Sequence, residues 1–160
     1  MNHSKRHWRP ARRQTWGSQH KRLPRFTQPF AQDVVVWRED EGAHDNIGVV
    51  RSNIARTCIQ HSPDGYECGY AGSGPADLAL NILNAFVPPR SGKVSRWSEA
   101  ERDDDPVPTY RGVASRFALA HHQRFKFEFV AVMDRQGGCI AAERIRAWIA
   151  QRREGAGTVT

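Results

Sequence analysis

The sequence has few of the features that mark secreted or membrane proteins. Its three cysteines are an odd number and do not predict a framework of paired disulfides. No apolar run reaches the roughly 18 residues that a membrane-spanning helix needs. A basic start followed by an apolar segment, which would indicate a signal peptide, is also lacking. We therefore expect a cytoplasmic protein that makes no membrane contact.

Acidic side chains are missing from the first 30 residues. Eight of the 24 lysines and arginines lie there, which leaves 16 to balance all 17 acidic residues, so residues 31–160 carry a formal charge of −1. Three prolines in the same stretch oppose a continuous helix. The sequence predicts a disordered basic arm over residues 1–30, a single domain over 31–154 and a frayed tail over 155–160.

The composition of the arm favours nucleic-acid binding. Lysine and arginine neutralise phosphates, and tryptophan rings can stack on unpaired bases. Binding of this kind needs no sequence preference. The alternative is an inert, solvated tail. The predicted contact residues are Lys5, Arg6, Trp8, Arg9, Arg12, Arg13, Trp16, Lys21, Arg22 and Arg25.

The clearest succession of local signals runs from Tyr66 to Phe86. A strand pattern at 66–70 leads into a loop that contains three glycines, and Pro75 then suits the first turn of a helix. We expect Gly74 to be the N-cap and the carboxylate of Asp77 to face the positive end of the helix dipole. One face of this helix is apolar and predicts a core contact through Leu78, Ile82, Leu83 and Phe86.

The whole pattern predicts an α+β fold: a small antiparallel sheet, made of a hairpin at 54–70 and an N-terminal strand, packed against about three helices. In the first half of the chain we predict a strand at 33–40, a short strand at 47–52, the hairpin and a helix that ends at 86. A surface excursion follows at 87–108, with at most one short helix capped by Ser98 and Glu101, and then a helix at 113–133 and an edge strand at 139–140. The last predicted element is a helix at 142–153 that buries Ile145, Trp148 and Ile149 and turns Arg144, Arg146, Arg152 and Arg153 outward.

The segment 113–133 carries two conflicting periodicities. Phenylalanines at every second position are typical of a strand, whereas an apolar or aromatic residue at every fourth position is typical of a helix. Because the segment is too long for an ordinary strand and is rich in alanine, we predict one long helix. The two competing sets are Phe125, Phe127 and Phe129 for the strand, and Phe117, His121, Phe125, Phe129 and Met133 for the helix.

Residues 69–80, GYAGSGPADLAL, are followed by Phe125-Lys126 and by an Ile145-x-x-Trp148-Ile149 helix end. In these segments the chain resembles a family of small proteins encoded largely by bacteriophages, plasmids and other mobile elements, a domain of unknown function. The resemblance lies mainly in the Gly-Ser-Gly-Pro-Ala segment and would cover roughly 33–153. It implies a compact α+β domain and carries no catalytic residues.

The glycine loop could also hold an anion, because backbone N–H groups ahead of a helix form a phosphate nest. The predicted ligand-binding residues are Gly72, Ser73 and Gly74. Three features oppose anion binding at this loop. The spacing of its glycines matches neither the dinucleotide fingerprint nor the P-loop. Pro75 lacks an N–H donor, and Asp77 adds a negative charge that would repel an anion. The alternative is a tight strand-to-helix connection.

The sequence also offers loosely spaced metal ligands. Cys58, His61 and Cys68, completed by Cys139 with His121 or His122, could in principle bind zinc, and a cysteine with a histidine base could act as a nucleophile. The acidic run at 99–105 could hold a divalent cation or be simply solvated. Because the spacings are unspecific, we predict no metal, no cofactor and no catalytic residue.

These observations favour a non-enzymatic accessory binding protein of a mobile element, associated with nucleic acid through the arm. No set of nucleophile, base and oxyanion donors stands at a recognisable spacing. Two alternatives remain open. The chain could inhibit a host system by protein–protein contact, or it could be a small enzyme or phosphate-ligand binder that uses the loop 72–75.

Overall fold

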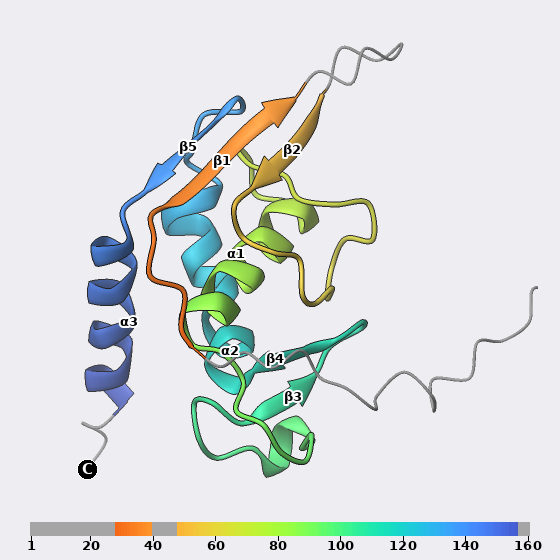
Figure 1. Cartoon of the computed structure of the whole chain (residues 1–160), viewed down its shortest axis with the longest axis vertical. Coiled ribbons are helices and arrows are strands. Elements are labelled where there is room, and N and C mark those ends of the chain that lie inside the picture. The colour runs from red at the N-terminus through yellow and green to blue at the C-terminus, as the bar shows by residue number, and fades with distance from the viewer. Residues whose placement is uncertain (1–27, 40–47, 157–160) are drawn as a thin grey trace, which may run out of the picture.

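The computed structural model describes residues 28–39 and 48–156, so most of the predicted arm and the last four residues lie outside it. The predicted α+β class is confirmed in this part of the chain (Figure 1). The elements are β1 (Val34–Glu39), β2 (Val49–Ser52), α1 (Ser73–Phe86), the 3₁₀ turn η1 (Trp97–Glu99), β3 (Pro106–Pro108), β4 (Val113–Ser115), α2 (Arg116–Phe125), the π-helical turn η2 (Lys126–Val130), β5 (Gly137–Ile140) and α3 (Ala142–Ala156).

The main sheet has the antiparallel order β2-β1-β5, so the predicted edge strand near residue 139 is confirmed as β5. β1 alternates as a half-buried strand does: Val34 and Val36 face the core, whereas Val35 and Trp37 are exposed. β3 and β4 form a separate two-stranded hairpin at the opposite end of the molecule (Figure 1).

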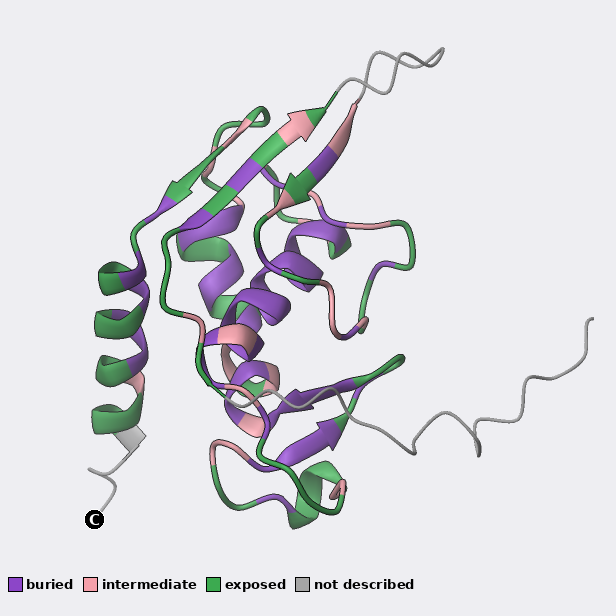
Figure 2. Ribbon diagram, viewed as in Figure 1, coloured by how far each residue is buried: buried purple, intermediate pink, exposed green. Residues whose placement is uncertain are grey.

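Helix α1 lies at the centre and is buried along almost its whole length (Figure 2). It packs most extensively against α2. The predicted apolar face is confirmed, since Leu78, Ile82 and Leu83 are fully buried and Phe86 is nearly so. The folded part begins no later than Phe30, which donates its N–H to the carbonyl of Ala85 and packs its ring on Phe86.

Helix α3 buries the three predicted side chains and exposes Arg144, Arg146 and Arg153. Arg152 departs from the prediction, because it is half-buried and its guanidinium lies over the ring of Trp148. The Trp148 ring packs edge-on against Phe125, and its indole N–H donates to Glu128. None of the helices in the described residues is both long enough and apolar enough to cross a membrane.

The predicted hairpin at 54–70 is wrong. Ile59 exchanges hydrogen bonds with Arg111, and Tyr66 forms an isolated bridge with Val50, so the two halves of the segment do not pair with each other. Several amides of 57–62 bond instead to polar side chains of α1. Side chains thus replace the ladder that a second strand would have supplied.

The predicted helix at 113–133 is partly confirmed. Residues 116–130 are helical, but 113–115 form strand β4, and Ser115 caps α2 by accepting from the N–H of Ala118. The helical periodicity prevails over the alternating one, because Phe125 and Phe129 are buried and stacked while Phe127 is exposed. The last turn widens to a π-helix, in which Ala131 donates to the carbonyl of Lys126.

The predicted surface excursion at 87–108 is also only partly correct, because Ala100, Asp105 and Val107 are buried. The N-cap of the 3₁₀ turn η1 is Arg96, so Ser98 and Glu101 do not cap it as predicted. The Asp105 carboxylate organises this loop. It accepts from the N–H groups of Glu101 and Arg102 at 2.8 and 2.9 Å and from Nε of Arg90 at 2.8 Å.

These hydrogen bonds predict a loss of stability in acid. Donation from the Arg102 and Glu101 amides and from Arg90 lowers the pKa of Asp105 from 3.8 to about 2. A carboxyl group whose pKa is lower in the folded state than in the unfolded state stabilises the fold at pH values above its unfolded-state pKa. That stabilisation is lost as the pH falls through the folded-state pKa of the group. We expect Asp105→Asn to unfold at a lower urea concentration than the wild type at pH 7, with the difference shrinking between pH 4 and pH 2. A difference that stays constant over this range would contradict the assignment.

Candidate functional site

A stripe of three polar side chains runs along the buried helix α1. Asp77, Asn81 and Asn84 are spaced four and three residues apart, so they lie on one face of the helix. All three are essentially inaccessible to solvent. We call them the polar stripe. Buried polar groups are stable only when they are hydrogen-bonded, and the stripe meets that requirement by binding the neighbouring loop.

Asp77 holds the loop that follows residue 59. Its Oδ1 accepts from the amides of Gln60 and His61 at 3.1 and 2.9 Å, and its Oδ2 accepts from the amide of Ser62 at 2.9 Å. The guanidinium of Arg56 lies 3.9 Å from Oδ2. The predicted place of Asp77 at the positive end of the helix dipole is wrong, because α1 has its N-cap at Gly72 instead of Gly74 and no acidic residue in its first turn. Three loop amides bind the carboxylate instead.

Asn81 and Asn84 continue the same arrangement. Asn81 Oδ1 accepts from the amides of Thr57 and Cys58, and its Nδ2 donates back to the Cys58 carbonyl at 2.9 Å. Asn84 Oδ1 accepts from the amide of Ser115 at 2.8 Å, where β4 meets α2. The stripe thus joins α1 both to the loop 57–62 and to the junction of β4 with α2.

The glycine loop packs tightly against its neighbours. A Cβ on Gly72 would lie 2.2 Å from the Tyr70 ring, and one on Gly74 would lie 2.6 Å from Cβ of Glu67. Gly69 has a φ of +82°, in the left-handed region that favours glycine. Of the predicted ligand residues, Gly72 is half-buried, Gly74 is buried and only Ser73 is exposed. Their ligand-binding role stays a prediction.

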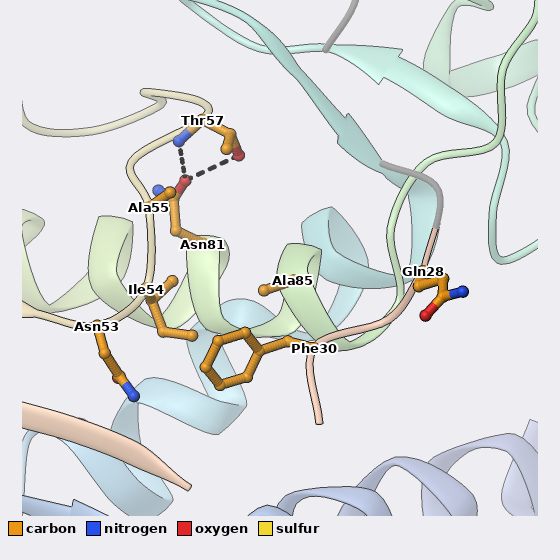
Figure 3. A pocket seen from close by; sticks show the side chains of 8 residues that line it. All are labelled: Gln28, Phe30, Asn53, Ile54, Ala55, Thr57, Asn81 and Ala85. Carbon is orange, nitrogen blue, oxygen red and sulfur yellow. Dashed lines mark hydrogen bonds between the residues drawn. The ribbon is translucent and has the colours of Figure 1, made fainter. Parts of the chain in front are cut away.

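A pocket of about 200 Å³ lies between α1 and the loop 53–57 (Figure 3). None of its lining residues is titratable. Asn53 Nδ2 donates to the Asp33 carbonyl, and Asn81 is held within the polar stripe, so both asparagine side chains of the wall already have partners. This recess suits an apolar group better than acid–base chemistry. Its lining residues are Gln28, Phe30, Asn53, Ile54, Ala55, Thr57, Asn81 and Ala85.

Two histidines and a glutamine converge where the loop held by Asp77 meets α2. Nε2 of His61 lies 2.8 Å from Nε2 of His122, and the carboxamide nitrogen of Gln123 lies 3.3 and 3.2 Å from these atoms. Nδ1 of His122 is 2.8 Å from the carbonyl of Leu119 and donates to it. Burial lowers the pKa of His122, so this imidazole is neutral at pH 7. We call these three residues the His61 cluster.

The cysteines do not join this cluster. Cys58 lies against the polar stripe, and burial raises the pKa of its thiol to about 12, which leaves it protonated and a poor nucleophile. Cys68 lies near the carbonyls of Asp134 and Arg135, and Cys139 is exposed on β5. Within residues 28–39 and 48–156, no group of three or more Cys, His, Asp or Glu is placed to hold a metal ion.

Less than half of the chain is similar to a known family. Residues 31–97 match a family of unknown function, DUF6166. The expected resemblance to a domain of unknown function is thereby confirmed, but over a shorter stretch than 33–153. No curated protein and no solved structure matches the chain.

The DUF6166 stretch contains the glycine loop, the polar stripe and His61. His122 and Gln123 lie beyond its end, as do the two downstream segments of the expected resemblance. The description of DUF6166 assigns no activity and does not mention mobile elements. The ten arm residues predicted to bind nucleic acid fall outside both DUF6166 and the described residues.

Proposed function

We propose that the chain is a non-enzymatic binding protein that associates with nucleic acid through residues 1–30, while residues 31–154 form its folded body. The observation that carries the proposal is the separation of charge. Eight cations and no acids occupy the arm, and the remainder of the chain is close to neutral. A phosphate backbone is attracted to such a segment without any requirement for a fixed base-reading surface.

The contacts of the folded body support this division. Many of its described arginines are engaged by carboxylates, so they are less available to phosphates than the arm cations. Examples are Arg38 with Glu67, Arg51 with Glu39, Arg90 with Asp105, Arg102 with Asp104, Arg124 and Arg152 with Glu128, and Arg153 with Asp103.

The non-enzymatic part of the proposal rests on the state of the candidate catalytic groups. Asp77 is bound by three amides, and Cys58 has a raised pKa in a buried site. Neither group is placed to exchange protons with a substrate or to attack one.

The proposal extends to the setting of the protein. We propose that it works in the cytoplasm as an accessory protein of a mobile element, on the resemblance described above. The outer face of the main sheet favours inhibition of a host protein as a second function. Val35 and Trp37 are 41% and 39% exposed side by side on β1, and exposed apolar groups of this kind commonly take part in protein contacts.

The arm proposal predicts salt-dependent binding. If all eight cations contacted duplex phosphates, log affinity would fall against log salt with a slope of about −7, and partial engagement would give a shallower slope. Trp8→Ala and Trp16→Ala should weaken single-strand binding more than duplex binding, because stacking on unpaired bases contributes about 1–3 kcal/mol per base. Fluorescence anisotropy with labelled oligonucleotides at several salt concentrations measures both effects.

The control is a chain that lacks residues 1–27, which removes all eight arm cations and keeps Phe30 in its contact with α1. It should melt as cooperatively as the full chain, since the apolar core lies within the described residues, and it should lose most of its affinity for nucleic acid. Equal binding by the two chains would refute the role of the arm. Binding of neither chain at low salt would shift the proposal to a protein partner on the face that carries Val35 and Trp37.

A further inference from the structure

We propose that His61 and His122 form a pH-sensitive clasp between the loop 59–62 and helix α2. The clasp is closed while the two rings together carry at most one positive charge, and it opens when both are charged. The inference rests on the direct hydrogen bond between the rings and goes beyond the proposed function of the arm. His61 lies within the DUF6166 stretch and His122 does not, so the clasp ties the part of the chain that matches the family to the part that follows it.

The two rings meet end to end. Their Nε2 atoms are 2.8 Å apart, and their centroids are 5.0 Å apart with an interplanar angle of 30°. This centroid distance is close to the greatest that two imidazoles can have at such a nitrogen–nitrogen distance. An N–H on one ring therefore points straight at the lone pair of the other, which is the geometry of a well-formed hydrogen bond.

The backbone fixes which ring donates. A carbonyl oxygen can only accept, so Nδ1 of His122 carries a proton and donates it to Leu119 at 2.8 Å. A neutral imidazole has a single N–H, which leaves a lone pair on Nε2 of His122 and makes His61 the donor. The carboxamide nitrogen of Gln123 lies 3.2 Å from the same lone pair and is a second donor to it.

A first proton strengthens the clasp. His61 is exposed, so its Nδ1 can take up a proton from water, whereas the lone pair of His122 is occupied by its donors. The charged His61 ring still donates through Nε2 to the neutral ring of His122. Hydrogen bonds with a charged donor are shorter and stronger than those between neutral groups.

A second proton opens the clasp. It has to go to Nε2 of His122, where it would face the Nε2–H of His61 across 2.8 Å, so the hydrogen bond is lost and two positive rings repel each other. Burial lowers the pKa of His122, and the facing His61 lowers it further. The folded chain therefore accepts this proton only at a lower pH than the unfolded chain does.

The other charged groups around His122 do not cancel this effect. The Leu119 carbonyl and the carboxylate of Asp77 on α1 favour the charged ring, yet the pKa of His122 is lowered overall. Arg56 lies 3.9 Å from Asp77 Oδ2 and offsets part of its negative charge. Lys126, one turn further along α2, adds a positive charge on the same side of this helix.

The sign of the pH dependence follows from the lowered pKa. A histidine whose pKa is lower in the folded state than its ordinary value of 6.5 leaves the fold fully stable above pH 6.5. Stability is then lost as the pH falls toward the folded-state pKa of His122. One such proton changes the unfolding equilibrium constant by up to about tenfold per pH unit. The clasp is thus closed at pH 7 and opens in acid.

The test is nuclear magnetic resonance of the imidazole nitrogens in the full chain between pH 8 and pH 4, above the range in which Asp105 titrates. At pH 8 the proton of His122 should be on Nδ1 and that of His61 on Nε2. His61 should be protonated before His122. The nuclear Overhauser effect between the two rings should persist through the first protonation and disappear with the second.

A substitution at the exposed His61 separates the clasp from burial alone. In His61→Gln the carboxamide donates to neutral His122 and, after a half-turn, accepts from the charged ring, so the titration midpoint of His122 should rise by about one pH unit. His121→Gln is the matched control, because the ring of His121 packs on Phe117 and Trp148 outside the pair, and it should leave that midpoint unchanged. An unchanged His122 midpoint in His61→Gln, or a neutral His122 with its proton on Nε2, would overturn the proposal.

Discussion

Asp77→Ala is expected to lower the free energy of unfolding by about 3 kcal/mol, because it leaves the amides of Gln60, His61 and Ser62 without their acceptor. The side chain is fully buried, so the substitution also opens a polar cavity beside α1. Urea unfolding monitored by circular dichroism measures the loss as a lower midpoint.

Two variants show whether the hydrogen bonds are responsible. Asp77→Asn keeps one acceptor oxygen and should fall between the wild type and Asp77→Ala. Asp64→Ala removes an exposed acid from the turn of the same loop and should change stability by less than about 0.5 kcal/mol. If Asp77→Ala unfolded at the wild-type midpoint, the polar stripe would have no structural role.

Gly74→Val is expected to destabilise the fold by about 3 kcal/mol or to prevent folding. A Cβ at this position would lie 2.6 Å from Cβ and 2.9 Å from Cγ of Glu67. Glu67 cannot easily give way, because its carboxylate is paired with Arg38 of β1 at 2.8 Å. Insertion of atoms into such a packed contact costs about 1–3 kcal/mol or more, and the second methyl of valine adds to it.

The neighbouring Ser73→Ala is the matched control for this prediction. Ser73 is exposed in the first turn of α1, and alanine is the best helix former, so thermal melting should shift little in either direction. Equal melting temperatures for Gly74→Val and wild type would show that the contact with Glu67 is not tight in solution.

Helical periodicity was the most reliable guide in the sequence. The face of α1 formed by Leu78, Ile82, Leu83 and Phe86 and the face of α3 formed by Ile145, Trp148 and Ile149 follow from spacing alone, because each is set by the geometry of a single helix. The edge strand β5 could be predicted for a similar reason, since its Gly-Gly start and its short length are local signals.

Local patterns of this kind could not show that the predicted hairpin at 54–70 is wrong. Its β-branched residues favour a strand, but its amides are satisfied by side chains about 20 residues away on α1, and no local pattern reveals such partners. A signal did exist. Asp77, Asn81 and Asn84 recur on one face of a helix that is otherwise apolar, which indicates a buried polar contact instead of a cap. The sequence offered His61 and His122 together only within a loosely spaced set of cysteine and histidine ligands, and no local pattern indicated that these two rings, 61 residues apart, meet without the cysteines.

The pairing of β1 with β5 has a consequence for the order in which the protein is made. Val34 lies opposite Ile140, so the central strand of the sheet is synthesised more than 100 residues before its second neighbour. A nascent chain that has reached only the end of the DUF6166 stretch at residue 97 has neither β5 nor α2 and η2, against which α1 packs. Such long-range closure slows folding and leaves apolar surface exposed in the meantime. The sheet can therefore be completed only after residues 137–140 have been synthesised.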